Sequence, residues 1–347
     1  MILPEITLQQ LQESAHTYRS DFVRLPVIGL ERSTRFMTLS MGVRGKETVF
    51  NPDFNAELQH YAVAERQKVS GDFLPRTLET FFGACFFDFD PNAVIKSVLG
   101  HRAAQAGNDS KNTVSAKEVA ASVIKNISKK INSCLFNAVL DETSKKTEGM
   151  FNGFDTITDK EIAAGNISVE KGNLLILDKP ITSANAYDMF QKILSAMSDE
   201  LREEKTNIFC SRSIADAYNQ NYLMTHQGIN YNKEYNQPYL EGSDQMSTFA
   251  PVVGKKGSKY IHITPKNNMR VGVDQMSDQE RVEFNKYEPK LVTGELYMFI
   301  GAQFESIDPR RMLVVQLPAA KTDTPAKPGT GESGSGNAGT GREGAGD

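Results

Sequence analysis

The feature that most restricts the fold is one long amphipathic stretch in the middle of the chain. Ser115 and Glu118 have the spacing of a capping box, a pattern typical of helix starts. The apolar residues that follow recur three and four positions apart, and lysines occupy the opposite side. These apolar residues are Ala120, Val123, Ile124, Ile127, Ile131, Cys134, Leu135 and Ala138. The pattern predicts a helix from Ala116 to about Leu140, roughly 37 Å long at about 1.5 Å per residue, which would act as a structural strut.

The other apolar runs are shorter and follow no regular strand–helix–strand rhythm. Strands are predicted at residues 84–90, 174–177, 207–210, 259–264, 295–300 and 311–317, and a helix at 213–224. A second amphipathic helix is predicted to begin with Thr182 or Ser183 as its cap and to reach Leu201. Interspersed strands and helices of this kind predict the α+β class.

The two ends of the chain and the region after residue 30 are predicted to extend from the packed body. Residues 34–50 alternate in polarity around a turn at Gly42–Gly45, which predicts a β-hairpin. A two-stranded projection is only marginally stable alone, so we expect this hairpin to lie on another surface. Residues 1–30 have sparse apolar positions and are expected to form an arm. No large apolar residue follows Leu317, which predicts a flexible tail.

Composition excludes several classes of protein. The 39 basic and 43 acidic residues give a formal net charge of -4, and both signs are mixed along the chain, unlike a groove-binding DNA protein. Three widely spaced cysteines fit reduced thiols better than a disulfide framework. The first residues lack the basic and apolar regions of a signal peptide, and no apolar run reaches the roughly 18 residues that span a bilayer, so we expect a cytosolic origin without membrane attachment.

The patterns of known catalytic and cofactor sites are absent from the sequence. Two glycine–lysine clusters, at residues 42–46 and 254–259, lack the glycine spacing of a phosphate-binding loop. Asp155, Asp159 and Glu161 lack the spacing of a calcium loop and are interpreted as solvated carboxylates. The tyrosines between residues 218 and 260 fit a packing surface better than a base-stacking platform, because basic residues do not alternate with them. We expect no catalytic residue, no cofactor and no metal.

Four stretches and the layout as a whole resemble a known family. The stretches are residues 76–83 (RTLETFFG), 135–137 (LFN), 151–158 (FNGFDTIT) and 260–274 (YIHITPKNNMRVGVD). Together with the arm, the hairpin and the strut helix, they resemble the major capsid proteins of tailed bacteriophages, which have the Hong Kong 97-type shell fold. The amino-acid sequences of these stretches are similar to those of capsid proteins from phages that infect Bacteroides-like hosts. The resemblance covers roughly residues 30–317.

The resemblance implies a division of the chain and a role. The implied parts are an N-terminal arm (1–30), an extended loop that lies over a neighbour (31–75), a peripheral domain with the spine helix (76–180 and 276–317), an axial domain (181–275) and a flexible tail (318–347). It implies a structural protein rather than an enzyme, one that assembles with itself into hexamers and pentamers of an icosahedral head and encloses double-stranded DNA without reading its sequence. Scaffold, portal and decoration proteins are the other implied partners. The implied location is the virion, with assembly in the host bacterial cytoplasm.

The candidate interface residues are Arg44, Lys46 and Glu47, which the predicted hairpin places at its tip. Some relatives cross-link neighbouring subunits through a lysine on the extended loop, and Lys46 occupies a suitable position. Its asparagine partner and a catalytic carboxylate could not be matched in this sequence, so no such cross-link is predicted.

Three alternatives remain open. An encapsulin-like compartment would have the same fold and would enclose an enzyme cargo. A metal-dependent hydrolase would use His226 or His262 with Asp155 or Asp159. A tail or baseplate structural protein is the third.

Overall fold

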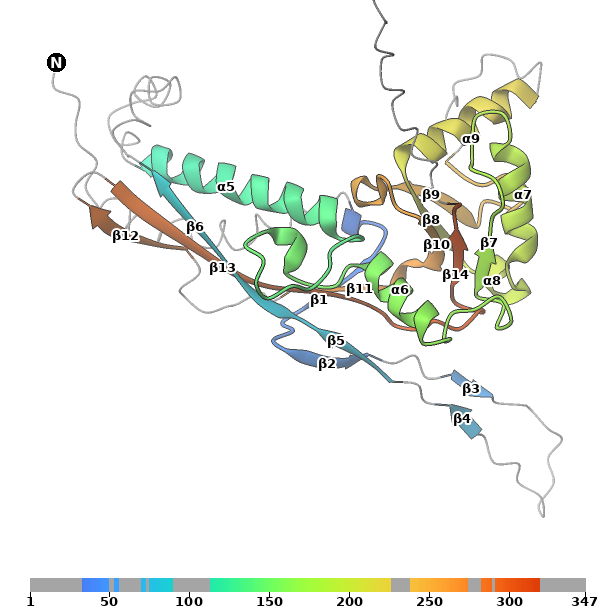
Figure 1. Ribbon diagram of the computed structural model, residues 1–347, viewed down its shortest axis with the longest axis horizontal. Coiled ribbons are helices and arrows are strands. Elements are labelled where there is room, and N and C mark those ends of the chain that lie inside the picture. The colour runs from blue at the N-terminus through green and yellow to red at the C-terminus, as the bar shows by residue number, and fades with distance from the viewer. Residues whose placement is uncertain are drawn as a thin grey trace, which may run out of the picture.

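The computed structural model describes residues 33–49, 53–55, 70–72, 75–89, 113–225, 238–273, 282–288 and 291–318. The arm expected at 1–30 and nearly all of the tail expected at 318–347 lie outside these ranges. Two five-stranded sheets with helices packed against them form the body, which confirms the α+β class (Figure 1). None of the helices in these ranges combines the length and hydrophobicity that crossing a bilayer requires.

The first sheet is built around one long strand, β13 (Leu291–Phe304). Antiparallel β6 (Phe81–Phe89) follows one edge of β13, and β12 (Val282–Glu288) and β11 (Met269–Val273) share the other edge. Strand β1 (Thr38–Met41) then pairs in parallel with β11. The strands predicted at 84–90 and 295–300 are therefore confirmed, although both extend further than the local pattern suggested.

The predicted strut helix is α5 (Thr113–Cys134), which lies along the first sheet (Figure 1). Its existence is confirmed, but its predicted ends are wrong. It begins before Ser115, and it stops six residues before Leu140. A longer helix would use the carbonyl oxygens of Leu135 and Phe136 for its own amides. Those oxygens instead accept the amide N–H groups of the following helix, at 3.3 and 2.8 Å.

That following helix, α6 (Phe154–Ala163), packs directly against the end of α5, after the short η1 turn (Thr147–Gly149). Gly153 makes the close approach possible, because a Cβ atom there would lie 2.3 Å from the carbonyl oxygen of Phe136. A cluster of fully buried rings fills the core beneath this junction. Its members include Phe136, Phe151, Phe154, Phe209 and Phe304.

The second sheet has the order β7-β14-β10-β8-β9. Its strands are β7 (Leu174–Ile176), β14 (Leu313–Gln316), β10 (Tyr260–Pro265), β8 (Thr206–Cys210) and β9 (Ser247–Pro251), and its helices are α7 (Ala186–Ala196), α8 (Asp199–Glu203) and α9 (Arg212–Thr225). The strands predicted at 174–177, 207–210, 259–264 and 311–317 and the helix predicted at 213–224 are confirmed.

The single helix predicted from residue 182 to Leu201 is wrong, because two helices occupy that stretch. Asn185 is the N-cap of α7, and its side-chain oxygen accepts hydrogen bonds from Thr182. The chain then leaves the helix at Met197, and Ser198 starts α8 by accepting the amide N–H of Leu201 at 3.3 Å. Ser198 also donates to the carbonyl oxygen of Pro309, so a distant segment fixes the break.

The sheets do not separate at the expected border near residue 275. Strand β11 belongs to the first sheet, although it lies within the segment 181–275. Strand β14 belongs to the second sheet, although it lies within the segment 276–317. The assignment of these segments to a peripheral and an axial domain stays a prediction.

The hairpin predicted over residues 34–50 is wrong. Strand β1 completes the edge of the first sheet, and the amide of Gly42 donates to the carbonyl oxygen of Val273 at 2.9 Å. Gly42 and Gly45, both with positive φ, then turn the chain away from that sheet. Strand β2 (Lys46–Val49) pairs with β5 (Arg76–Glu79), and β3 (Asp53–Asn55) pairs with β4 (Ser70–Asp72). These four strands form a projection, called the ribbon below, that extends away from the body (Figure 1).

The close contact at Gly153 gives a stability test. Changing Gly153→Ala should lower the free energy of unfolding by about 1–3 kcal/mol, because the new methyl group overlaps the backbone of Phe136. Denaturant unfolding would measure the loss. Ser133→Ala, which removes an exposed hydroxyl near the end of α5, is the control and should change stability by no more than about 0.5 kcal/mol. An equal effect of both substitutions would contradict the packing described here.

Candidate assembly interface

The ribbon joins the body through a small apolar root. Leu78 of β5 is fully buried together with Val43 and Val49, which form a separate hydrophobic cluster with it. Thr80 continues the root with polar contacts: its hydroxyl donates to the carbonyl oxygen of Val43 at 3.0 Å and accepts the amide N–H of Gly45 at 3.0 Å. Side chains from both ends of the ribbon therefore hold the root together.

Two glycines let the root lie directly on the first sheet. A Cβ atom on Gly301 of β13 would come within 2.0 Å of the carbonyl oxygen of Glu79. One on Gly272 of β11 would come within 2.7 Å of the Thr80 side chain. The backbone of the ribbon thus meets the sheet directly at Gly301, and the Thr80 side chain fills the space over Gly272, which together fix where the ribbon leaves the body.

Arg76 fixes the direction of the ribbon. Its guanidinium donates to Glu161 of α6 at 2.5 Å, to the Gln303 side chain at 3.2 Å and to the carbonyl oxygen of Phe304 at 3.0 Å. The Arg76 and Glu161 side chains are only 13% and 17% exposed. An arginine bound by three groups from two elements is a rigid clamp, because its planar donors match several acceptors at once.

Arg44, Lys46 and Glu47 are exposed at the base of the ribbon. The predicted placement at a hairpin tip is wrong: Lys46 is the first residue of β2, and it forms an exposed ion pair with Glu79 at 3.1 Å. The segment that connects β3 to β4, residues 56–69, lies outside the described residues. The strand pairs of the ribbon were not predicted from the sequence, because the paired strands are short and far apart along the chain. An interface role for these three residues stays a prediction.

An aromatic surface lies on one face of β6 and β13. Phe82 and Phe86 are 58% and 63% exposed, and Tyr297 and Phe299 lie beside them. Tyr297 contacts both phenylalanines, with ring centroids 5.5 Å from Phe82 and 6.3 Å from Phe86. The Phe82 and Phe299 centroids are 4.9 Å apart. Neighbouring exposed rings of this kind are typical of surfaces that other protein chains cover.

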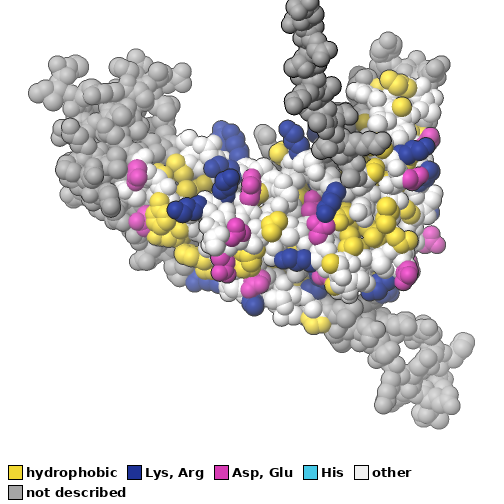
Figure 2. Space-filling model, viewed as in Figure 1, with side chains coloured by type: hydrophobic (Ala, Val, Ile, Leu, Met, Phe, Trp, Pro, Cys, Tyr) yellow, Lys and Arg dark blue, Asp and Glu magenta, His cyan; other side chains and the backbone are white. Residues whose placement is uncertain are grey.

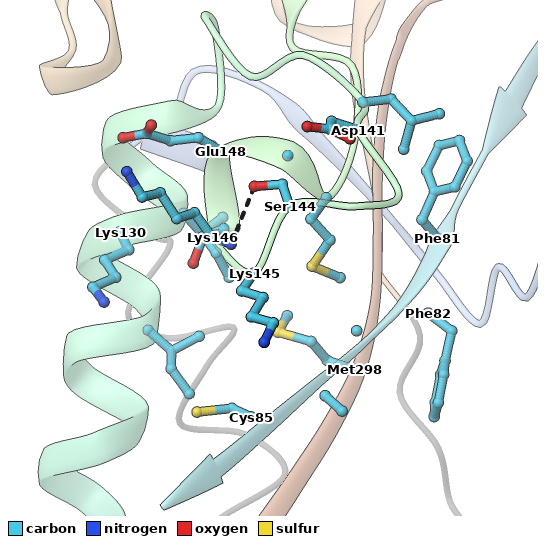
Figure 3. Close-up of a pocket in the computed structure, with 18 of the residues that line it drawn as sticks. Phe81, Phe82, Cys85, Lys130, Asp141, Ser144, Lys145, Lys146, Glu148 and Met298 are labelled. Atoms are coloured by element: carbon cyan, nitrogen blue, oxygen red, sulfur yellow. Dashed lines mark hydrogen bonds between the residues drawn. The ribbon is translucent and has the colours of Figure 1, made fainter.

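The opposite face of these strands forms the floor of a cavity of about 880 Å³ beneath α5. Figure 3 shows Phe81 of β6 and Met298 of β13 on one side, with Lys130 of α5 and Lys145 and Lys146 from the loop after α5 around it. Cys85 also lines the cavity, and burial raises the pKa of its thiol. The raised pKa keeps the thiol protonated, so this hollow offers apolar contacts rather than a reactive nucleophile.

A buried polar cluster lies where the two sheets approach each other. The ammonium group of Lys255, in the short η2 turn (Val253–Lys255), is 2.5 Å from Asp155 Oδ1 and 2.7 Å from His262 Nδ1. The hydrolase alternative relied on a pairing of His262 with Asp155, and these two groups do lie near each other, with Nδ1 and Oδ1 3.8 Å apart. The Lys255 amino group contacts both, so the position that a metal cation would need is already occupied.

Asp159, the other described member of that alternative, already has two partners. Asp159 accepts a hydrogen bond from the Tyr260 hydroxyl at 2.7 Å and forms an ion pair with Lys259 at 2.8 Å. His226 lies outside the described residues. Within the described ranges, no group of three or more histidine, cysteine or acidic side chains is arranged to hold a metal ion.

The hydrogen bonds define the state of His262. The hydroxyl of Thr158 donates to the carbonyl oxygen of Phe154 at 2.8 Å, so towards His262 Nε2, also at 2.8 Å, it can only accept. Nε2 therefore carries the proton and Nδ1 accepts from Lys255. Burial, and then the nearby Lys255, lower the pKa of His262 well below its ordinary value, which keeps the ring neutral.

The neutral ring predicts a dependence of stability on pH. Below about pH 6.5 the unfolded histidine binds a proton that the folded His262 does not, so the free energy of unfolding should fall as the pH decreases from 7 to 5, by up to about 1.4 kcal/mol per pH unit from this group. Denaturant unfolding at several pH values would measure the slope. The slope should be smaller in His262→Gln and should persist in Thr158→Val, which keeps the titrating ring. An unchanged slope in His262→Gln would contradict this assignment.

The clamp on the ribbon gives a second test. Arg76→Met should cost about 2–3 kcal/mol of stability and should speed hydrogen exchange in β5, because Glu161 loses its charged partner in a mostly buried position. Lys46→Met is the matched control from the same strand pair. Its ion pair is 69% and 44% exposed on its two sides, so its loss should cost no more than about 0.5 kcal/mol. Similar exchange rates in both variants would show that Arg76 does not hold the ribbon.

Known proteins resemble this chain in fold rather than in sequence. No family model and no curated protein matches it. A chain of the satellite phage P4 procapsid, in a structure that includes the size determination (Sid) protein, is similar with a TM-score of 0.53 and 13% identity, over 86% of this chain and 98% of that chain.

Two further structures are similar at lower TM-scores. The capsid of a native GTA particle gives a TM-score of 0.49 at 10% identity, over 83% of this chain and 90% of that chain. The capsid of cyanophage A-1(L) gives 0.48 at 14% identity, over 85% and 92%. The match to the satellite phage procapsid, which extends over 98% of that chain, confirms the predicted fold: this chain has the α+β shell fold of a phage capsid.

Proposed function

We propose that this protein is the major capsid protein of a tailed bacteriophage. Copies of the chain assemble into hexamers and pentamers, and these form an icosahedral head around double-stranded DNA. The fold of a phage capsid protein supports the proposal, and the observation that carries it is the ribbon. The root of the ribbon is rigidly anchored, yet among the residues that the structure describes its strands pair only with one another.

Beyond its root, the described strands β2 and β5 bury few side chains within their own subunit. Three of the four residues of β2 are exposed, and Leu78 is the buried residue of β5. An isolated two-stranded ribbon is marginal in water, so the surface that completes it belongs to another molecule. A second copy of the chain supplies that surface at the high local concentration of a shell, which couples the order of the ribbon to assembly.

Charge supports a wall around DNA rather than a DNA-binding site. The net charge is -4, and Figure 2 shows basic and acidic side chains interspersed over the described surface on that face. A strongly basic wall would hold phosphates at many points and resist filling, since phosphate contacts dominate nucleic-acid affinity. The protein then has a structural role without catalysis, in the virion, after assembly in the bacterial cytoplasm. Scaffold, portal and decoration proteins and a Bacteroides-like host belong to the same proposal.

The direct test is expression of the full chain, alone and with the products of neighbouring genes, followed by sedimentation and electron microscopy. We expect closed, roughly icosahedral particles. Particles that package a cargo protein instead of nucleic acid would point to an encapsulin-like compartment. A chain that remains monomeric under all assembly conditions would contradict the proposal.

Shortening the ribbon tests the observation that carries the proposal. Because Val49 and Arg76 are paired, deletion of residues 53–72 leaves a short loop that can connect β2 to β5 without disturbing the root. The shortened chain should fold with an unchanged thermal midpoint, since it loses only β3, β4 and the segment between them. It should fail to form closed shells under conditions in which the full chain does. Normal shells from the shortened chain, seen by electron microscopy, would contradict the role of the ribbon.

A further inference from the structure

The buried cluster around Lys255 has a composition that neither the fold nor shell assembly requires. Lys255 and His262 are completely buried, and the Asp155 side chain is 9% exposed. They come from three elements, since Asp155 lies in the first turn of α6, Lys255 in η2 and His262 in β10. A primary amine, a carboxyl group and a neutral imidazole thus share one enclosed site.

The amine and the carboxyl group are close enough to react. Lys255 Nζ lies 2.5 Å from Asp155 Oδ1, and the carboxyl carbon is one bond further. This brings nitrogen and carbon close to the roughly 3–3.5 Å of a near-attack pair. Lys255 cannot easily move away, because η2 is pressed against α5: a Cβ atom on Gly254 would lie 2.9 Å from the Asn132 carbonyl oxygen.

We propose that Lys255 and Asp155 form an intramolecular isopeptide bond. A proton moves from the ammonium to the carboxylate, giving a neutral amine and a neutral acid. Nζ then attacks the carboxyl carbon of Asp155, and a C–N bond forms while His262 Nδ1 takes a proton from the nitrogen. His262 returns that proton to the departing hydroxyl, the C–O bond breaks, and one water molecule leaves. The product is an amide, and no oxidant, cofactor or second molecule is consumed.

The surrounding groups fit each step. His262 Nδ1 is the proton acceptor in the tautomer that Thr158 imposes, and it lies 2.7 Å from Nζ. The hydroxyl of Ser258 donates to Asp155 Oδ2 at 2.6 Å, which draws electron density from the carboxyl carbon and makes it more electrophilic. General acid–base assistance of this kind accelerates reactions by about 10²–10⁴-fold.

The environment favours the neutral form of the Lys255 amine. Burial is the main cause that lowers the pKa of Lys255, against the opposing charge of Asp155. The Phe136 ring lies over the amine, with Nζ 4.5 Å from its centroid, and Phe304 packs against His262 with ring centroids 5.5 Å apart. Rings on these sides limit the access of water, so an amide formed here is protected from hydrolysis.

The bond would staple two parts of the chain that are distant in sequence. It would tie α6, which packs on the first sheet, to the turn that leads into β10 of the second sheet. A subunit stapled in this way resists separation of its sheets, a useful property for a wall that contains a pressurised genome. The bond lies within one subunit and is independent of the assembly function.

Intact-mass spectrometry of the full-length protein under denaturing conditions tests the proposal. The wild-type chain should be lighter than its sequence by the mass of one water molecule, and a tryptic digest should contain the peptide of Asp155 joined to that of Lys255. Asp155→Asn should lose one ammonia instead of water, because an asparagine side chain releases its amide nitrogen. A wild-type mass equal to that of the sequence, without the joined peptide, would overturn the proposal and leave a simple ion pair.

Matched variants separate this site from other causes of mass loss. Lys255→Met should have its full sequence mass, whereas Lys256→Met, which changes the exposed neighbour, should keep the loss of water. His262→Phe should slow formation of the bond by about 10²-fold or more, followed as the linked fraction with time after induction. A loss of water that persists in Lys255→Met would place the modification elsewhere and contradict the assignment. Shell formation by an unlinked wild-type chain would leave the capsid proposal standing.

Discussion

The junction between α5 and α6 is the contact on which the rest of the structure depends. The oxygens of Leu135 and Phe136 accept the first amides of α6, which ends one helix and starts the next with shared hydrogen bonds. The Phe136 ring then lies 5.5 Å from Phe154 of α6 and 6.0 Å from Phe209 of the second sheet. A single fully buried ring thus joins the strut helix, α6 and the second sheet in one core.

Local sequence patterns predicted an element correctly where its formation does not depend on which other segment packs against it. The alternation in β6 and the helical spacing in α5 identified those elements, because each buries one face whatever lies opposite. The patterns failed where hydrogen bonds to distant backbone groups determine where an element ends or which strand it pairs with. Leu135 and Phe136 look helical in sequence, and only the amides of α6 end the helix there. Residues 34–50 look like a hairpin, and only the pairing of β1 with β11 separates their strands.

The candidate site shows the same difference between local patterns and long-range contacts. Arg44, Lys46 and Glu47 are exposed at the base of the projecting segment, and their role in an interface stays a prediction; the tip of that segment was placed too early in the chain. The ribbon is specified by its root, where Leu78, Thr80 and Arg76 meet residues that are 29 or more positions away. A single sequence carries no signal for such contacts. In the Lys255 cluster, His262 and Asp155 were considered together, and Lys255 was missed because the lysines of the glycine-rich stretch 254–259 predict an exposed turn.

The two glycines beneath the root have a mechanical consequence. Gly301 brings the backbone of the ribbon into direct contact with the backbone of the sheet, and Gly272 leaves room for the side chains of Thr80 and Leu78. Any change in the twist of β13 would therefore be transmitted to the ribbon without being absorbed, and would grow with distance from this pivot. Small differences in the coiling of β13 would then change the direction in which the ribbon extends and the distance that it reaches.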